Sequence, residues 1–459
     1  MNMPRRTLKT LGFGITFLFF AMVFAWLPVD TAMAQVVSSV VGGVAIDEGA
    51  MRTATKQENA QLARDMAQLV NLIPEGLDQE SPYRKVSLKM LNAEMERCIA
   101  EERDFTPAVC FLGGLTAIKY VVADPENNDV LLIGPAEGWR VDETGSVVGK
   151  RSGSPVLLLQ DLLTVFRAWD TDRPRVITCS IDPTPDAVAK IQQILRTQAR
   201  PGEERARAYA LEQANGNHVV TIEGVPDTSR FAKVLAAADY KMKRIGLGHE
   251  KSPNNLVPSY VSLINARTRN ASAMPRFWFA PEYETIHHDS KELIWDIGGL
   301  KVKTLTEEEY FDVRNGRPVS TGRVDAAAKR WCDMMNRNFE RLASADPVFG
   351  DLKNCMDVAM VVALIHRENL LGKANCRLPA FSQSARLRLP TYPAPKTVAA
   401  KSIINRNIVA CGGVEINPFQ KLEDCRLDSK LDALEQTLTV PTGETWYTNT
   451  DMPKYVFAK

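Results

Sequence analysis

Residues 103–169 constrain the fold of this chain more than any other stretch, because every local signal in them agrees. Three apolar runs, at 118–123, 130–133 and 139–141, are separated by clusters of Asp, Asn, Pro and Gly. Such clusters mark turns between short strands. The stretch therefore predicts a β-meander followed by a helix, and none of its side chains points to a reaction.

Two amphipathic helices are expected before the meander. Thr55 and Glu58 form a capping-box pattern that opens the first, and apolar residues recur at helical spacing until Pro74. A second apolar stripe lies within residues 84–101, with charged residues on its other side. These two helices most simply cover one face of the meander.

The pattern after residue 171 alternates between strand and helix. Strand-like runs at 176–181, 218–225 and 240–245 are separated by two helical runs, the first opened by Thr184-Pro185. This order predicts an α+β sandwich of ferredoxin-like type, with helices on one face of a mostly antiparallel sheet.

Further strands and a helical hairpin follow. The aromatic run 276–283 and a hairpin of 292–297 with 300–305, turning at Gly298-Gly299, are expected to extend the sheet. Residues 323–372 show two amphipathic helices joined at Asp346-Pro347, which predicts a helical hairpin.

Two similar short segments lie near opposite ends of the chain, VGGVAID at 41–47 and CGGVEIN at 411–417. Two such strands can lie side by side and tie the ends together, although so short a match also arises by chance.

The whole chain is thus expected to have an α+β fold made of a meander with covering helices, an α/β sandwich and a helical hairpin. Its 459 residues, 45% hydrophobic and 24% charged, suffice for two or three cores. The expected segments are a signal peptide (1–34), N-terminal helices with the meander (35–170), the sandwich (171–322), the helical hairpin (323–378) and a Pro-rich segment with a short β-hairpin and a loose tail (379–459).

The N-terminus has the pattern of a secretory signal. Arg5, Arg6 and Lys9 precede an uncharged apolar run at 11–27, and the small-residue site Ala32-Met33-Ala34 predicts cleavage before Gln35. An uncleaved membrane anchor is the rival interpretation, and Arg5-Arg6 leaves the twin-arginine route open beside the general one. Cleavage would leave no membrane span and place the chain in the periplasm or at the cell surface.

The charge of the mature chain argues against nucleic acid as a partner. Loss of three basic residues and Asp30 with residues 1–34 lowers the formal net charge from +1 to −1. A near-neutral chain has no electrostatic attraction for a polyanion.

All eight cysteines follow residue 34, and an even number in an oxidising compartment predicts disulfides. The preferred pairs are Cys98 with Cys110 and Cys332 with Cys355. Buried free thiols are the alternative, especially for Cys179 within a strand-like run.

The common catalytic and cofactor motifs are missing from the sequence, which holds no G-x-S-x-G, H-E-x-x-H, C-x-x-C or G-x-G-x-x-G pattern. Gly145–Arg151 has the wrong spacing and context for a phosphate loop. His287-His288-Asp289 is interpreted as a polar turn rather than a metal site, because adjacent histidines usually diverge. No cofactor is therefore expected.

The segment Lys241–Lys251 is the candidate binding site. It is interpreted as a basic strand that runs into two glycines, whose backbone N–H groups can form an anion nest. The expected ligand-binding residues are Lys243, Arg244, Gly246, Gly248 and His249. A solvated basic strand is the plainer alternative.

Two other groups of residues have both a structural and a functional interpretation. Phe277-Trp278-Phe279 places aromatics on both faces of a strand, which indicates burial on both sides or a partner-binding patch. Cys179 is favoured as a core residue over a nucleophile assisted by His218 or His249.

Several motifs spread over residues 40–417 give the chain a family resemblance. They include Gly113–Tyr120, Gly134–Trp139, Ser180–Pro185, Phe277–Pro281 and Pro347–Asp357. With them the chain resembles a family of exported bacterial proteins known mainly from planctomycetes and described only as a domain of unknown function. The resemblance implies export and a shared fold, and no activity.

Two functions are expected from these observations. The first is an exported protein that binds or scaffolds an unknown protein or other partner in the cell envelope. The second is a secreted hydrolase with a site near Gly246–Glu250, formed by His249, Glu250 and a carboxylate such as Asp182.

Overall fold

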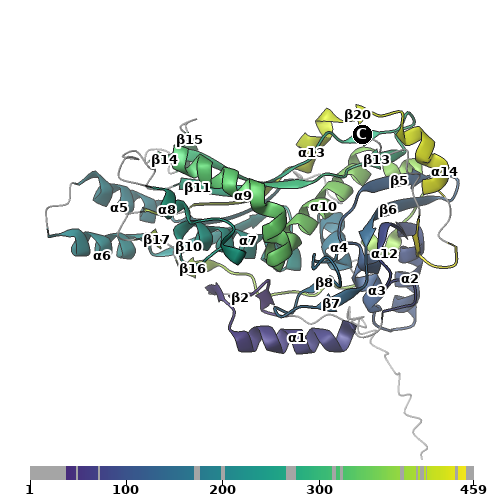
Figure 1. The fold of residues 1–459 in the computed structure, drawn as a ribbon, viewed down its shortest axis with the longest axis horizontal. Helices are drawn as coiled ribbons and strands as arrows, with labels where there is room; N and C mark the ends of the chain where they lie inside the picture. The colour runs from purple at the N-terminus through teal and green to yellow at the C-terminus, as the bar shows by residue number, and fades with distance from the viewer. Residues whose placement is uncertain are drawn as a thin grey trace, which may run out of the picture.

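A computed structural model shows that the chain has an α+β fold, as predicted from its sequence (Figure 1). It describes residues 38–47, 50–70, 73–169, 176–197, 202–264, 275–312, 317–320, 324–382, 387–399, 402–403, 408–409, 411–439 and 443–450. Two seven-stranded sheets in these ranges are joined by a group of helices. The first sheet lies on the right of Figure 1 and the second on the left.

The first sheet is built around the hairpin that the turn cluster at 124–129 predicts. Its strands, in spatial order, are β20 (Arg426–Leu427), β12 (His287–His288), β13 (Ile294–Asp296), β5 (Tyr120–Asp124), β6 (Asp129–Ala136), β4 (Ser81–Ser87) and β21 (Tyr447–Asn449). β5 and β6 pair antiparallel, and the Asp124 carboxylate accepts a hydrogen bond from the Asn127 backbone N–H at 3.1 Å in the turn. This part of the predicted meander is confirmed.

The third strand of the predicted meander is elsewhere. β7 (Trp139–Val141) pairs with β8 (Val147–Gly149) in a separate two-stranded ribbon. In a meander β7 would pair with β6, but β4 already pairs with that edge of β6. Residues 84–87 of β4 were predicted to be helical. The helix α2 (Leu88–Ala100) begins only after Ser87, whose hydroxyl caps it.

The second sheet contains strands from the middle and the end of the chain. Its order is β15 (Arg317–Ser320), β14 (Lys301–Asp312), β11 (Pro275–Glu282), β19 (Cys411–Ile416), β9 (Ile177–Pro183), β10 (Asn217–Glu223) and β16 (Thr397–Ala399). β19 lies between β11, to which it is parallel, and β9, to which it is antiparallel. A strand from residue 411 onwards is therefore central to the sheet.

Two strand predictions are wrong. Residues 240–245 are not a strand but belong to the helix α7 (Arg230–Leu247), which leaves the expected strand–helix order one strand short. Residues 292–305 do not form a hairpin, because β13 pairs with β5 in the first sheet while β14 pairs with β11 in the second. Gly298-Gly299 therefore connects two sheets.

The predicted helical hairpin is confirmed as α9 (Ala326–Ala345) and α10 (Pro347–Arg367). Asp346 caps α10, and Pro347 occupies its first turn, where a missing N–H costs nothing. Every residue of α10 from Val348 to Ile365 is buried except Lys353. A helix that is apolar on all sides belongs in a core.

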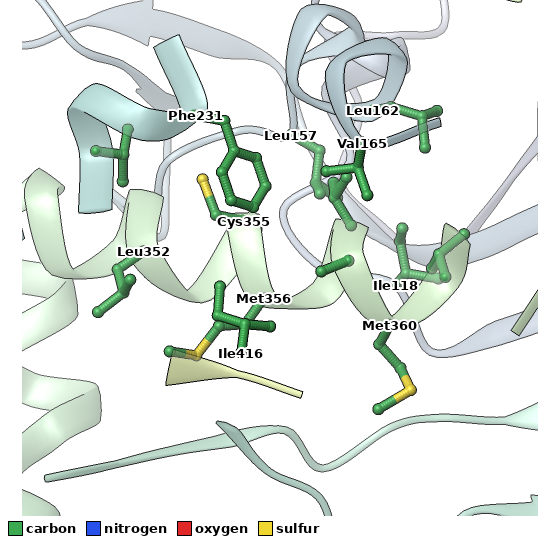
Figure 2. Close-up of a cluster of buried hydrophobic side chains, with 14 of the residues drawn as sticks. Ile118, Leu157, Leu162, Val165, Phe231, Leu352, Cys355, Met356, Met360 and Ile416 are labelled. Atoms are coloured by element: carbon green, nitrogen blue, oxygen red, sulfur yellow. The ribbon is translucent and has the colours of Figure 1, made fainter. Parts of the chain in front are cut away.

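Figure 2 shows what surrounds α10. Cys355 projects toward Phe231 of α7, and Met356 lies beside Ile416 of β19. Leu162 and Val165 of α4 (Leu159–Ala168) belong to the same buried cluster. One buried hydrophobic cluster extends from Val41 to Trp446. The domain limits expected from the sequence stay a prediction.

The N-terminal part of the described chain is a small three-stranded sheet with one helix. It comprises β1 (Val40–Val41), β2 (Val44–Asp47), β3 (Ala50–Thr53) and α1 (Lys56–Val70). Thr55 and Glu58 form the expected capping box, with each backbone N–H donating to the other side chain at 2.8 and 3.2 Å. β2 and β19 lie in different sheets, so the two similar glycine-containing segments do not pair.

The remaining helices are shorter or lie at the periphery. α5 (Pro185–Arg196) and α6 (Glu204–Asn215) pack on each other and form the projection on the left of Figure 1. The other α-helices are α3 (Pro107–Cys110), α8 (Tyr260–Leu263), α11 (Leu370–Lys373), α12 (Pro379–Ser382), α13 (Pro418–Lys421) and α14 (Glu435–Leu438). β17 (Ser402–Ile403) and β18 (Ile408–Val409) form a further two-stranded ribbon.

The two preferred disulfides are not formed. All seven cysteines whose side chains are described are free thiols, including Cys98, Cys110, Cys332 and Cys355. Counted from the turn at Asp346, the last two lie 14 and 9 residues away, so they are offset by about 7.5 Å along antiparallel helices, which exceeds the reach of a disulfide. The Cys110 thiol instead donates to the Phe105 carbonyl, and Cys411 lies outside the described side chains.

Candidate functional site

A partly open cavity of about 80 Å³ lies between the N-terminal segment and the core of the molecule. β1 and α1 contribute to its lining, together with the segment 145–160 and the N-terminal parts of α7 and α10. We call it the N-terminal cavity. Most of its wall is apolar and consists of Val40, Val41, Leu62, Met66, Phe111, Val147, Val156 and Leu158.

The polar end of the N-terminal cavity is a buried ionic cluster of three side chains. Arg230, the first residue of α7, donates from Nη1 to Asp161 Oδ2 at 2.5 Å and from Nη2 to Asp351 Oδ1 at 2.8 Å. The side chains are 14%, 5% and 4% exposed, respectively. Arg230 and Asp351 line the cavity. The planar guanidinium is suited to holding two carboxylates at once.

Three helices begin near this cluster, which explains how it is positioned. Asp161 lies in the first turn of α4, Arg230 begins α7, and Asp351 is the fifth residue of α10. Carboxylates are favoured near helix N-termini because the backbone N–H groups there carry partial positive charge. Asp161 therefore suits the start of α4, whereas Asp351 lies just beyond the first turn of α10. The arginine between the two acids offsets their repulsion.

Each carboxylate of the cluster keeps one oxygen without a hydrogen bond. Asp161 Oδ1 and Asp351 Oδ2 are buried and have no partner among the described residues. Leaving a buried acceptor unsatisfied costs about 1–3 kcal/mol. A buried acceptor without a partner calls for an explanation, such as a bound water molecule or a ligand.

The same burial shifts the protonation of these acids. Burial raises the pKa of Asp161 to about 6; the charge of Arg230 opposes this shift and the charge of Asp351 adds to it. Burial likewise raises the pKa of Asp351, against the charge of Arg230. Perturbed acids in a cavity are a common property of binding and catalytic sites.

A second polar group borders the cavity beside the ionic cluster. The Tyr392 hydroxyl donates to Gln160 Oε1 at 3.0 Å, and both residues line the cavity. The ammonium of Lys233 lies 4.8 Å from the centre of the Tyr392 ring and donates to the Ser38 carbonyl. Burial lowers the pKa of Lys233 to about 7.

α7 holds the N-terminal segment against the core through two lysines. Lys233 binds the carbonyl of Ser38, and Lys241 donates to the carbonyl of Gly42 at 3.5 Å while pairing with Asp346. The apolar side of the cavity thus depends on contacts made by α7.

The predicted ligand residue Lys243 is buried within the chain. Its ammonium donates to Ile181 O at 2.5 Å, to Asp239 Oδ2 at 2.9 Å and to Gly412 O at 2.9 Å. An ammonium has three donors, so these contacts account for all of them.

The other predicted ligand residues lie at the C-terminal end of α7 rather than in a strand. Gly248 caps the helix with φ +75°, and its N–H and that of His249 donate to helix carbonyls. Arg244 pairs with Glu250 at 2.9 Å, and Gly246 packs against the ring of Trp331. The backbone N–H groups that an anion nest needs therefore already donate within the chain. Ligand binding at these residues stays a prediction, and the anion nest does not support it.

The residues proposed for a hydrolase are engaged in the same way. Asp182 accepts a hydrogen bond from the Gly412 N–H at 2.9 Å, and Glu250 accepts one from Arg244. Cys179 is buried, and burial raises the pKa of its thiol well above the usual value. Burial lowers the pKa of His218 to about 4. The hydrolase stays a prediction.

His287 and His288 do not lie in the expected turn but form strand β12 of the first sheet, and Asp289 follows that strand. The Asp289 carboxylate accepts hydrogen bonds from the backbone N–H groups of Leu293 and Ile294 at 2.7 and 2.8 Å. In the described ranges, no three His, Cys, Asp or Glu side chains are grouped so as to hold a metal ion.

Phe277 and Phe279 are buried on one face of β11. The half-buried Trp278 contacts the Arg276 guanidinium at 5.0 Å from the ring centre. The strand is thus fully buried on one face only.

A second hollow lies between α2, α3 and β21, and it is wider and more open than the N-terminal cavity. It has a volume of about 520 Å³ and is bordered by Glu94, Arg97 and Trp446 among others. Glu94 and Arg97 pair with each other, so their charges offset one another.

The sequence analysis missed the ionic cluster, although a signal for it exists. Asp161 is the one charged residue in the mostly apolar run at 156–166, and Asp351 is one of few charged residues in a mostly apolar helix. A charge inside such a run is rarely buried without a partner. The sequence alone does not say that the two acids share Arg230.

Comparisons with known proteins give one match. Residues 179–260 match a protein family described as "Protein of unknown function (DUF1598)". This segment includes Arg230 of the ionic cluster and Lys233, Lys241 and Lys243 of α7. No curated protein and no solved structure matches the chain. No helix in the described ranges has both the length and the apolarity needed to cross a bilayer.

Proposed function

We propose that this chain is an exported binding protein of the cell envelope and that its ligand occupies the N-terminal cavity. The observation that carries the proposal is the combination of an apolar wall with a buried ionic cluster whose Asp351 keeps an unsatisfied oxygen. Pockets that bind small molecules are mostly apolar, with a few polar groups that fix orientation.

Export is supported by the N-terminal sequence. The basic residues, the apolar run and the site at Ala32–Ala34 follow the order of a secretory signal. The resemblance to exported bacterial proteins of unknown function points the same way. Partners in the periplasm or at the cell surface follow from that location.

The size of the cavity limits what it binds. A volume of about 80 Å³ is larger than a single water molecule needs and smaller than the pockets of drug-sized ligands. The cavity therefore suits a compound of a few heavy atoms, or the end of a longer molecule that extends through the opening.

Binding is tested with three small probes and two variants. Propylammonium, 1-propanol and propionate are each added to the purified chain, and binding is followed by ligand-observed NMR. The Met66→Trp variant fills the cavity from α1, and Ala60→Trp places the same ring on the same helix at an exposed residue that does not line the cavity. We expect at least one probe to bind the native chain and Ala60→Trp and to be lost in Met66→Trp. If no probe binds in this way, the proposed site is wrong.

Export is tested separately. The full chain is produced in a Gram-negative host, and the N-terminus of the recovered protein is sequenced. We expect a periplasmic protein that begins at Gln35. A protein that begins at Met1 and stays in the cytoplasm contradicts the location.

A further inference from the structure

The polar end of the N-terminal cavity lacks a hydrogen-bond donor. Asp351 Oδ1 accepts from Arg230 Nη2 at 2.8 Å, whereas Asp351 Oδ2 is buried without a partner in the described part of the chain. An ionised carboxylate only accepts hydrogen bonds. A ligand that satisfies this oxygen must therefore bring an N–H or O–H group.

The charges around Asp351 favour a cation over a neutral donor. Arg230 divides its single positive charge between Asp161 and Asp351, so the ionic cluster carries a net negative charge when both acids are ionised. Asp142 adds a further negative charge that acts on Asp351. Lys233, the other cation nearby, donates to the Ser38 carbonyl and lies over the Tyr392 ring. An anionic ligand would meet uncompensated carboxylate charge.

The apolar wall defines the rest of the ligand. Val40 and Met66 of the N-terminal segment and Val156 and Leu158 of the core all line the cavity. A short alkyl chain gains free energy from burial against these side chains, at about 0.8 kcal/mol per CH₂ in general. The cavity volume leaves room for a few carbon atoms.

We propose that the N-terminal cavity binds a primary ammonium group on a short alkyl chain, with the ammonium donating to Asp351 Oδ2. This inference rests on the proposed function and specifies its ligand class. The ligand is a small alkylamine or the amine-bearing end of a longer molecule. Recognition combines one charge-assisted hydrogen bond with apolar burial.

The native chain alone provides the first test. Propylammonium, 1-propanol and propionate share the same three-carbon chain and differ in the polar group. We expect propylammonium to bind at least about tenfold more tightly than 1-propanol, and propionate not to bind. Equal or tighter binding of 1-propanol or propionate overturns the inference.

Two variants provide the second test. Asp351→Asn keeps the shape of the side chain but removes its charge, and we expect propylammonium affinity to fall at least about tenfold, as for loss of a hydrogen bond to a charged group. Asp161→Asn also removes one negative charge from the ionic cluster, but Asp161 does not line the cavity. We therefore expect Asp161→Asn to lower propylammonium affinity less than Asp351→Asn does. Circular dichroism of both variants checks that they fold. Unchanged affinity in a folded Asp351→Asn chain overturns the inference.

The two proposals fail in different ways. If 1-propanol binds the native chain as well as propylammonium does and is lost in Met66→Trp, the cavity is a binding site and the ammonium is wrong. If no probe binds, the site itself is wrong. The comparison of the three probes needs no variant, so it holds even if Asp351→Asn does not fold.

Discussion

α7 carries two buried clusters of oppositely charged side chains, and only one of them borders the N-terminal cavity. Near the start of the helix, Arg230 joins Asp161 and Asp351 at that cavity. Near its end, Lys243 pairs with Asp239 and binds two backbone carbonyls, and neither residue lines the cavity.

The unsatisfied oxygens do not distinguish the two clusters. Asp239 Oδ1 also lacks a partner among the described residues, like Asp161 Oδ1 and Asp351 Oδ2. Burial raises the pKa of Asp239 to about 7, so this acid takes up a proton near neutrality. The difference is the cavity, because Asp351 lines it and Asp239 does not. An unsatisfied group therefore becomes a candidate site only where a cavity leads to it.

The largest effect is expected from removing the lysine of the enclosed cluster. Lys243→Met leaves Asp239 and two carbonyls without their donor, so we expect unfolding free energy to fall by about 3–5 kcal/mol. Urea denaturation measures this. Lys329→Met, at an exposed pair on α9, is the control and should change stability by less than about 0.5 kcal/mol. A loss of less than about 1 kcal/mol for Lys243→Met would mean that this cluster is not closed to water.

Removing the arginine of the cavity cluster should cost less. In Arg230→Met, water reaches Asp351 through the cavity and the two acids can take up a proton, so we expect a loss of about 1–3 kcal/mol. The same urea experiment measures it. A loss larger than that of Lys243→Met would reverse the comparison between the clusters.

The two clusters should lower the stability of the chain over pH ranges whose upper limits differ by about one pH unit. The folded pKa values of Asp161 and Asp239, about 6 and about 7, lie above the unfolded value of about 3.9. The native state then binds more protons than the unfolded state, so each acid lowers stability as pH rises from about 4 to its folded pKa. We expect Asp239→Asn to flatten the stability profile up to about pH 7 and Asp161→Asn only up to about pH 6. Parallel profiles for the native chain and Asp239→Asn would contradict this.

The smallest effect is expected at the wall of the cavity. Thr55→Ala removes the hydroxyl that accepts the Glu58 N–H at the start of α1, the helix that carries Leu62 and Met66. We expect amide hydrogen exchange in residues 56–70 to become several-fold faster, with little change in global stability. Ser344→Ala, at an exposed hydroxyl near the end of α9, is the control. Unchanged exchange would mean that packing alone holds α1.

Local signals predicted the elements that local interactions determine. At Thr55 the capping hydrogen bond joins residues only three positions apart. At Asp346-Pro347 the cap and the proline likewise act on the first turn of the helix that follows them. The helical hairpin and α1 were therefore predicted correctly. The α+β class followed from the same kind of evidence.

Long-range packing explains the failures. Apolar and charged residues alternate at 240–245 as they do in a strand, yet these residues continue α7. Met242 and the charged Lys243 are both buried, so the buried side of the helix is not uniformly apolar and the sequence shows no clear amphipathic pattern. Gly298-Gly299 resembles a hairpin turn, and nothing local specifies that its flanking strands belong to different sheets. The N-terminal cavity joins residues as far apart as Ser38 and Tyr392, which no local pattern relates.

The position of β19 has a consequence for the order in which this molecule is completed. Residues 411–416 fill the space between β9 and β11, so those two earlier strands are linked through the sheet only once β19 is in place. The first sheet has the same dependence, since its two outermost strands come from residues 426–427 and 447–449. A ribosome-bound fragment ending before residue 411 has neither sheet finished, because the strands at 411–416, 426–427 and 447–449 are all missing from it.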